Sequence, residues 1–303
     1  MKIYIKRPSI QGAWIWIIKG YASAWEETGF EVLYYDLIRN IPTNEEYDLM
    51  VRDWDLKDAD DLKVIEAARR VYFFPQPNEF PLPWGSHPNF YSQCSDIFIN
   101  KLNKLDNVYL WSYGTETKHH TKWKEINFIP LAFDSINYKP VYDKKYEFDV
   151  CFIGGWANNG FNEKRKIMLE HFGAFKNSGL KCGFFINKGL THEQENLILC
   201  SSKIALNLHD VHQRALVGSD TNERTFKSLG LNGLLVSDNV KHIKELGLNA
   251  VLTENPKEMV DAVKEYAFGL SQEEREEIKV KNRQNTLQKH TYLNRIESML
   301  ELK

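Results

Sequence analysis

The chain has 303 residues, of which 43% are hydrophobic and 26% charged, and its formal net charge is −2. This length predicts about two domains, and the composition is that of an ordinary globular protein rather than a disordered or fibrous one. The near-neutral charge excludes a global basic field of the kind that dominates nucleic-acid binding, and leaves only a local basic patch open.

Cysteines and the N-terminus indicate the compartment. None of the four cysteines forms a CxxC pair, which favours free, mostly buried thiols in a reducing environment (Cys94, Cys151, Cys182 and Cys200). The N-terminus lacks the apolar core of a signal peptide. The most apolar early stretch, 13–18, is far shorter than the roughly 20 residues that a membrane span needs. We expect a cytoplasmic protein without a transmembrane segment.

The first half of the chain alternates short apolar segments with helical periodicity. Strands are predicted at 2–6, 30–35, 47–51 and 71–74, and helices at 13–28 and 56–70. This order predicts a parallel sheet covered by helices. The Pro-rich stretch 75–90 is excluded as a helix or a central strand and is predicted to be a functional loop.

A second series of strands and helices follows a polar segment without hydrophobic period at 133–147, the predicted linker. Its predicted strands are 148–153, 180–186, 204–208, 234–236 and 250–253, and its predicted helices are 162–177, 191–201, 222–231, 240–246, 256–268 and 271–300. We therefore predict two α/β domains, residues 1–140 and 141–303.

Polar residues follow the strand ends of the second domain, where ligands of parallel sheets bind. Gly154-Gly155, Asn207, His209 and Asp238 occupy such positions, and Asn222, Glu223, Arg224 and Thr225 begin a helix. A helix N-terminus and an arginine suit a phosphate, and Lys227 lies one turn further on the same side. The alternative is an ordinary N-cap at Asn222 with solvated cations.

Metal binding is not predicted. Adjacent residues such as His119 and His120 point apart, and no third ligand is suitably spaced.

Several segments resemble one family of enzymes. They are FDVCFIGGWANNGFNEKRKIML (148–169), IALNLHD (204–210) and NERTFKSLGLNGLLVSD (222–238), preceded by IPLAFDSINYKP (129–140). In order and spacing, residues 148–296 resemble the C-terminal domain of GT-B glycosyltransferases of the spore-maturation-protein-like group, within the large retaining class. The first half resembles that family only in outline.

The resemblance implies two Rossmann-like domains facing each other across a cleft, with the last helix, about 283–303, packing back on the first. It implies metal-independent, retaining hexosyl transfer from a nucleotide-diphosphate sugar, expected to be a UDP-sugar, without a permanently bound cofactor. The expected catalytic residues are Arg224, Lys227 and His209, and the expected donor-binding residues are Gly154, Gly155, Arg165, Asn207, Asn222, Glu223, Thr225 and Asp238. The acceptor, a glycan or another hydroxyl-bearing molecule, is expected at Gln11, Gly12, Trp14 and His87.

One residue departs from the family pattern. Lys227 stands where the family has a glutamate that contacts donor hydroxyls, and an ammonium group cannot accept hydrogen bonds. Either Lys227 faces phosphate, or it has another role while Glu223 supplies the carboxylate.

Three alternatives stay open. A catalytically inactive nucleotide- or glycan-binding relative is favoured by Lys227. A nucleotide-sugar epimerase needs acidic residues near the sugar, and the sequence has no clear trio. A transferase that glycosylates modified bases in DNA needs a basic, aromatic-lined groove in the first domain, which the net charge neither supports nor excludes.

Overall fold

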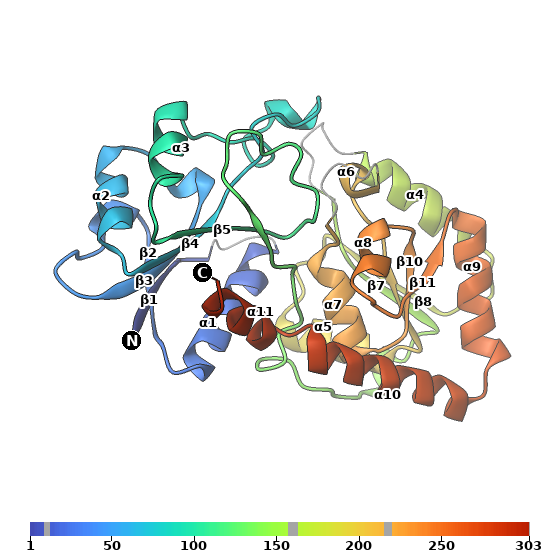
Figure 1. Cartoon of the computed structure of the whole chain (residues 1–303). Helices are drawn as coiled ribbons and strands as arrows, with labels where there is room; N and C mark the ends of the chain where they lie inside the picture. The colour runs from blue at the N-terminus through green and yellow to red at the C-terminus, as the bar shows by residue number, and fades with distance from the viewer. Residues whose placement is uncertain (9–12, 157–162, 215–219, 303) are drawn as a thin grey trace. The chain divides into compact units, whose positions relative to one another are not determined.

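The computed structural model describes residues 1–8, 13–156, 163–214 and 220–302. The chain forms two compact units, one made of Met1–Pro130 and Tyr292–Lys303 and the other of Leu131–Thr291 (Figure 1). Each unit has its own parallel sheet with helices packed against it, so the predicted α/β class is confirmed.

The first unit contains a six-stranded sheet in the order β2-β1-β3-β4-β5-β6, and every pairing is parallel. The strands are β1 (Lys2–Lys6), β2 (Glu31–Tyr35), β3 (Tyr47–Arg52), β4 (Arg70–Phe74), β5 (Val108–Ser112) and β6 (Asn127–Phe128). The helices are α1 (Trp14–Glu27), α2 (Ala59–Ala67), α3 (Asp96–Leu102) and α11 (Tyr292–Leu300). β3 and β4 are buried along almost their whole length, as central strands of a parallel sheet are.

α2 is shorter than the predicted helix at 56–70 because a capping box fixes its start. The Asp58 carboxylate accepts hydrogen bonds from the amides of Asp60 and Asp61, at 3.0 and 3.3 Å. Asp61 in turn accepts from the amide of Asp58 at 3.1 Å, which satisfies amides that the helix leaves unpaired. The helix ends at Ala67 because the chain must turn into β4, where the Arg69 amide donates to the carbonyl of Tyr47.

The second unit contains a five-stranded parallel sheet in the order β11-β10-β9-β7-β8. The strands are β7 (Val150–Gly154), β8 (Cys182–Ile186), β9 (Ile204–Asn207), β10 (Leu235–Asp238) and β11 (Val251–Thr253). The helices are α4 (Lys164–Ala174), α5 (His192–Ser201), α6 (Val211–Arg214), α7 (Glu223–Leu231), α8 (Lys241–Glu245), α9 (Pro256–Lys264) and α10 (Gln272–Lys289). Its core includes Phe152, Leu206, Val236 and Met259, from three strands and α9.

The division between the units falls at Pro130–Leu131 rather than at the predicted 140–141. Phe133 packs against Gly230 of α7, where any side chain would overlap its ring. The Phe133 amide donates to the carbonyl of His290 at 2.8 Å, and Phe133 pairs with Thr291 in a parallel bridge. These contacts tie the start of the predicted linker to the second unit.

The predicted helix 271–300 is divided in two, because its halves pack in different units. α10 lies against Gly233, whose φ of +82° favours glycine and whose space is filled by the backbone of Lys279. α11 packs on α1 instead, with the Tyr292 and Tyr21 ring centroids 4.7 Å apart. The Arg295 Nε also donates to the carbonyl of Pro130 at 2.9 Å. The segment in the first unit therefore begins at Tyr292, not near 283.

Packing of α11 on α1 gives a stability prediction. A Cβ at Gly20 of α1 would overlap the buried ring of Tyr292, whereas a Cβ at Gly173 of α4 meets no atom within 4 Å. Gly20→Ala should lower the free energy of unfolding by about 1–3 kcal/mol through overpacking. Gly173→Ala, the matched control, should raise it by up to about 1 kcal/mol through helix propensity. Urea unfolding followed by circular dichroism measures both, and equal midpoints would contradict the packing.

Candidate active site

Three parallel strands of the second unit end beside the N-terminus of α7. β7 ends at Gly154, β9 at Asn207 and β10 at Asp238. Asn222 is the N-cap of α7, and its side-chain oxygen accepts a hydrogen bond from the Thr225 amide at 3.3 Å. The same oxygen accepts from the Asn207 Nδ2 at 3.0 Å, so the cap is attached to the end of β9. The capping role foreseen as an alternative is therefore one of two roles of Asn222.

Arg224 is the cation at the centre of this edge. Its Nε donates to the carbonyl of Ile153 at 2.5 Å, and its Nη1 donates to the Asn207 Oδ1 at 2.9 Å. Its guanidinium carbon lies 4.7 Å from the centroid of the Phe152 ring. Among the described residues, these partners are carbonyl and amide oxygens and a ring, and no carboxylate lies within ion-pair distance. Burial lowers the pKa of Arg224, as expected for a cation without a close counter-charge.

Gly154 and Gly155 leave room for neighbouring side chains. A Cβ at Gly154 would overlap the guanidinium of Arg224, and one at Gly155 would overlap the side-chain oxygen of Asn187. The sequence suggested close approach of a ligand at these positions. In this structure the space belongs to protein side chains, and Gly154 permits the placement of Arg224.

A chain of short polar contacts links α7 to the ends of β9 and β10. The Asn207 Nδ2 donates to the Thr225 Oγ1 at 2.8 Å, and the Thr225 and Thr221 hydroxyls are 2.6 Å apart. Thr221 Oγ1 lies 2.7 Å from His209 Nε2, and His209 Nδ1 lies 2.7 Å from the Asp238 carboxylate. This network holds the residues around Arg224 in fixed positions.

The expectation that His209 is catalytic is not supported by its surroundings. Its exposed fraction is 0%, and both ring nitrogens already have partners. A buried imidazole with two partners is poorly placed to exchange a proton with a substrate. We assign His209 a positioning role.

Asp238 is a buried carboxylate compensated by its neighbours. Burial alone would raise the pKa of this carboxyl, but His209 and Arg214 bring it below the ordinary value of 3.8. The Arg214 Nε lies 3.3 Å from the carboxylate. The His209 amide also donates to it, at 3.1 and 3.2 Å. Asp238 thus joins the end of β10 to the segment after β9.

Lys227 does not have the contacts expected of a phosphate ligand. Its Nζ lies 2.9 Å from Glu195 on α5 and 3.3 Å from Glu223, and 5.2 Å from the centroid of the Tyr138 ring. Burial alone would lower the pKa of Lys227, but Glu223 and Glu195 raise it above its ordinary value. The ammonium group is therefore neutralised inside the protein. Burial raises the pKa of Glu223 despite the nearby Lys227.

Lys164, the neighbour of the predicted donor residue Arg165, is the buried one of the two. Lys164 is buried in the first turn of α4, and its Nζ lies 3.0 Å from the Asp210 carboxylate. Burial lowers the pKa of Lys164, with Asp210 opposing this change and the Arg224 charge adding to it. Arg165 is exposed, and its guanidinium lies 5.7 Å from the centroid of the Trp156 ring. Helical geometry could have separated the two, because adjacent helical residues face different directions.

The first unit carries an aromatic cluster at the ends of its own strands. The guanidinium of Arg52, at the end of β3, lies 4.6 and 4.7 Å from the ring centroids of Trp14 and Trp54. Asp55 fixes Arg52 from the other side, 3.2 Å from its Nε. The ring centroid of Trp14 lies 5.7 Å from that of Trp54 and 6.3 Å from that of Tyr113. Of the expected acceptor residues, Trp14 belongs to this cluster.

The other expected acceptor residues are not part of that cluster. His87 lies in the Pro-rich loop, where its Nδ1 accepts from the Asn89 amide at 3.2 Å and its ring packs against Phe90. Gln11 and Gly12 lie outside the described residues.

The described part of the chain contains neither a cluster of metal ligands nor a membrane-spanning helix. No group of three or more His, Cys, Asp or Glu side chains there is arranged to hold a metal ion. No helix there is both long enough and apolar enough to cross a membrane.

The chemistry available at the edge of the second sheet is anion binding. Arg224 supplies a fixed positive charge, which is close enough to Lys164 to lower the pKa of that ammonium group, and α7 supplies a helix N-terminus. Such a set of preorganised dipoles and cations stabilises a diphosphate and any negative charge that develops on it.

A family model described as glycosyl transferase-like matches residues 143–301, about half of the chain. No curated protein matches the chain significantly.

Solved structures match over the whole chain at low sequence identity. T4 phage BGT in complex with UDP and Mn²⁺ is 13% identical, with 100% of both chains covered and a TM-score of 0.59. A structure described as trehalose-6-phosphate from E. coli bound with UDP-2-fluoro glucose is 9% identical, with 99% and 98% covered and a TM-score of 0.56. An α,α-trehalose-phosphate synthase (UDP-forming) from Burkholderia vietnamiensis is 10% identical, with 96% and 80% covered and a TM-score of 0.51. At these identities the matches establish the fold, which is the GT-B fold that the sequence predicts.

The buried carboxylate of Asp238 gives a pH prediction. The pKa of this carboxyl is lower in the native state than in the unfolded state, where it is 3.8. The ionised carboxylate therefore stabilises the native state at pH values above 3.8, and this stabilisation is lost as the pH falls through the native-state pKa. Asp238→Asn should therefore lower the free energy of unfolding by about 2 kcal/mol near neutral pH. Urea unfolding should show this gap closing as the pH falls below 3.8. A gap of constant size across the pH range would contradict the assignment.

Proposed function

The chain belongs to the glycosyl transferase-like family, and from this premise we propose that it transfers a sugar from a UDP-sugar to a hydroxyl group of an acceptor. The observation that carries the proposal is Arg224, a fixed cation at the strand ends whose described partners are oxygens and a ring, not a carboxylate. A diphosphate supplies the missing negative charge. The choice of uridine as the nucleoside is supported by the T4 phage and E. coli structures of the same fold, which hold UDP and a UDP-sugar analogue.

In the proposed reaction, the acceptor oxygen forms a bond to the anomeric carbon as the bond between that carbon and the diphosphate oxygen breaks. Negative charge develops on the departing diphosphate, where Arg224, Lys164 and the N-terminus of α7 stabilise it. In the retaining course that the family resemblance implies, the acceptor approaches on the face of the leaving group. The departing oxygen then takes the hydroxyl proton, and no strong protein base is required. Transfer without a metal ion is part of this proposal, and retention of activity in EDTA would support it.

We assign recognition of the donor hydroxyls to Glu223. Its carboxylate lies in the first turn of α7, within ion-pair distance of Lys227, which holds it in place. A carboxylate accepts hydrogen bonds from hydroxyls, and the ammonium at position 227 cannot. Lys227 and Glu195 thus act as positioning residues. The second candidate function is nucleotide binding without turnover. In that case Lys227 would mark a site that has lost the hydrogen bond between the donor hydroxyls and a carboxylate.

We assign acceptor binding to the cluster of Trp14, Arg52 and Trp54 in the first unit. Indole faces stack on sugar and base rings, and Arg52 is rigidly held to offer hydrogen bonds.

The donor site is tested by thermal unfolding with UDP, GDP and dTDP. UDP should raise the melting temperature of the wild type, because a ligand that binds only the folded state stabilises it. Arg224→Ala should abolish the shift, and Lys164→Met should weaken binding by about tenfold. Lys166→Met is the matched control, since Lys166 is exposed on the same helix, and it should respond like the wild type. No shift with any diphosphate, or a full shift in Arg224→Ala, would overturn the proposal.

The acceptor site is tested by comparing two reactions of the same donor. Trp14→Ala and Trp54→Ala should lower kcat/KM for transfer by about tenfold or more, a loss of stacking worth roughly 1–3 kcal/mol. Slow hydrolysis of UDP-sugar by water should be unchanged in both variants, because the donor site is intact. The acceptor panel includes oligosaccharides and DNA with hydroxyl-bearing modified bases. Tyr91→Ala is the control, since Tyr91 is an exposed aromatic residue directly after the Pro-rich stretch. Equal losses in hydrolysis and transfer would contradict an acceptor role.

Sugar release from UDP-sugars separates an enzyme from a binding protein. A nucleotide-induced thermal shift without either hydrolysis or transfer across the donor panel would favour the inactive relative.

A further inference from the structure

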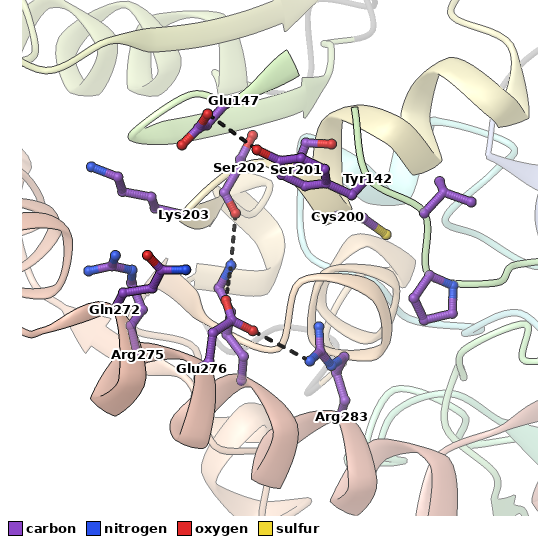
Figure 2. Close-up of a pocket in the computed structure, with 13 residues that line it drawn as sticks. Tyr142, Glu147, Cys200, Ser201, Ser202, Lys203, Gln272, Arg275, Glu276 and Arg283 are labelled. Carbon is purple, nitrogen blue, oxygen red and sulfur yellow. Dashed lines mark hydrogen bonds and ion pairs between the residues drawn. The ribbon is translucent and has the colours of Figure 1, made fainter. Parts of the chain in front are cut away.

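A cavity lies at the amino-terminal ends of the strands in the second unit, whereas the proposed donor site lies at their carboxyl ends. It is lined by residues just before β7 and β9, by the end of α5 and by one face of α10, and its volume is about 650 Å³ (Figure 2). Ser202 and Lys203 precede β9, whereas Asn207 of the donor site ends that strand. Four residues of strand span about 13 Å, so the length of β9 separates the two sites. A cavity of this size suits a small molecule.

The lining of the cavity is polar and carries more positive than negative charge. Its charged residues are Lys203, Arg275, Lys279, Arg283, Glu147 and Glu276, so cations exceed carboxylates by two. Figure 2 shows the side chains of Arg275, Glu276 and Arg283 on α10 facing the cavity beneath Ser202.

Two of the four cations are engaged in tight internal contacts. The Arg275 Nη1 lies 3.2–3.3 Å from the carbonyls of Tyr266, Ala267 and Leu270, where it closes the preceding helical turn. Lys203 pairs with Asp149 at 2.7 Å. These contacts hold Arg275 in place and pair Lys203 with a carboxylate.

Lys279 and Arg283 are less well compensated. Lys279 is 4% exposed, and its Nζ makes one hydrogen bond within the described part of the chain, to the carbonyl of Ser202 at 2.9 Å. An ammonium group has three N–H donors. The nearest carboxylate, Glu276, lies 3.7 Å from Lys279 and 3.8 Å from Arg283, beyond hydrogen-bond distance of either. Burial lowers the pKa of Lys279 to about 8, consistent with this poor compensation.

The cavity wall that bears these cations is rigid. Gly233 lies against the backbone of Lys279, and the Asn282 Nδ2 donates to the Gly233 carbonyl at 2.8 Å. Asn232 fixes the facing end of α5 by donating to the carbonyls of Leu199 and Ser202, both at 2.7 Å. The donors are thus preorganised, which reduces the entropy lost when a ligand binds.

We propose that this cavity is a second ligand site, distinct from the donor site, which binds a small molecule bearing an oxyanion through Lys279 and Arg283. Phosphate esters and polycarboxylates share this chemistry, because both present several oxygens with delocalised negative charge to cationic donors. The site stands independently of the proposed sugar transfer.

The test is thermal unfolding of the full chain with sodium phosphate and, separately, sodium citrate, at ionic strength held constant with sodium chloride. At least one anion should raise the melting temperature in a saturable manner. Arg283→Gln and Lys279→Met should each weaken the apparent affinity by about tenfold, as expected for loss of one charge-assisted hydrogen bond. Lys281→Gln is the matched control, since Lys281 is exposed on the same helix.

Arg224→Ala removes the proposed donor site, so a saturable anion response that remains in this variant is assigned to the cavity. A response to phosphate alone identifies the ligand as a phosphate ester, and a response to citrate alone identifies a polycarboxylate. The proposal is overturned if neither anion gives a saturable shift, or if Arg224→Ala removes the shift while Arg283→Gln and Lys279→Met keep it. Circular dichroism of each variant shows whether a lost response is due to misfolding. Lys203→Gln is a further variant in the cavity lining for the same comparison.

Discussion

The second unit is organised around the interactions of the Arg224 guanidinium. This group is held by the carbonyl of Ile153, the side chain of Asn207 and the ring of Phe152, so two strands and α7 must be in register before it can take this position. Gly154 is required because any side chain there would overlap it. A cation placed by neutral oxygens keeps its charge available, and this is the property that a diphosphate site needs.

The other buried ions of this unit are distributed by the same electrostatic rule. Lys227 is neutralised by two glutamates, and Asp238 is compensated by His209 and Arg214, because a buried charge without a partner is costly. The exceptions are informative for that reason. Among the described residues, Arg224 at one end of the strands has no carboxylate within ion-pair distance, and Lys279 at the other end has only Glu276, at 3.7 Å.

The parallel sheet explains why the proposed donor site and the cavity lie at opposite ends of the strands. All the carboxyl ends of the strands lie together, and so do all the segments that enter them. Polar residues after β7, β9 and β10 therefore converge on one site, while Lys203, Glu147 and α10 surround another at the entering ends. One sheet thus provides two distinct polar surfaces without any change of fold.

Local patterns in the sequence determined the α/β class, most of the strands and helices, the cap at Asn222 and the placement of Arg224 in the first turn of α7. Each depends on residues a few positions apart, and the helix and strand periods make such relations readable. Tertiary structure alone decided that Lys227 pairs with Glu195, that His209 is buried with both nitrogens occupied, and that the last helix breaks at Thr291. These outcomes depend on contacts between residues distant in the chain, or on which side of a helix meets the rest of the protein. The energy of burying a charge is set by those contacts, and no local pattern records it.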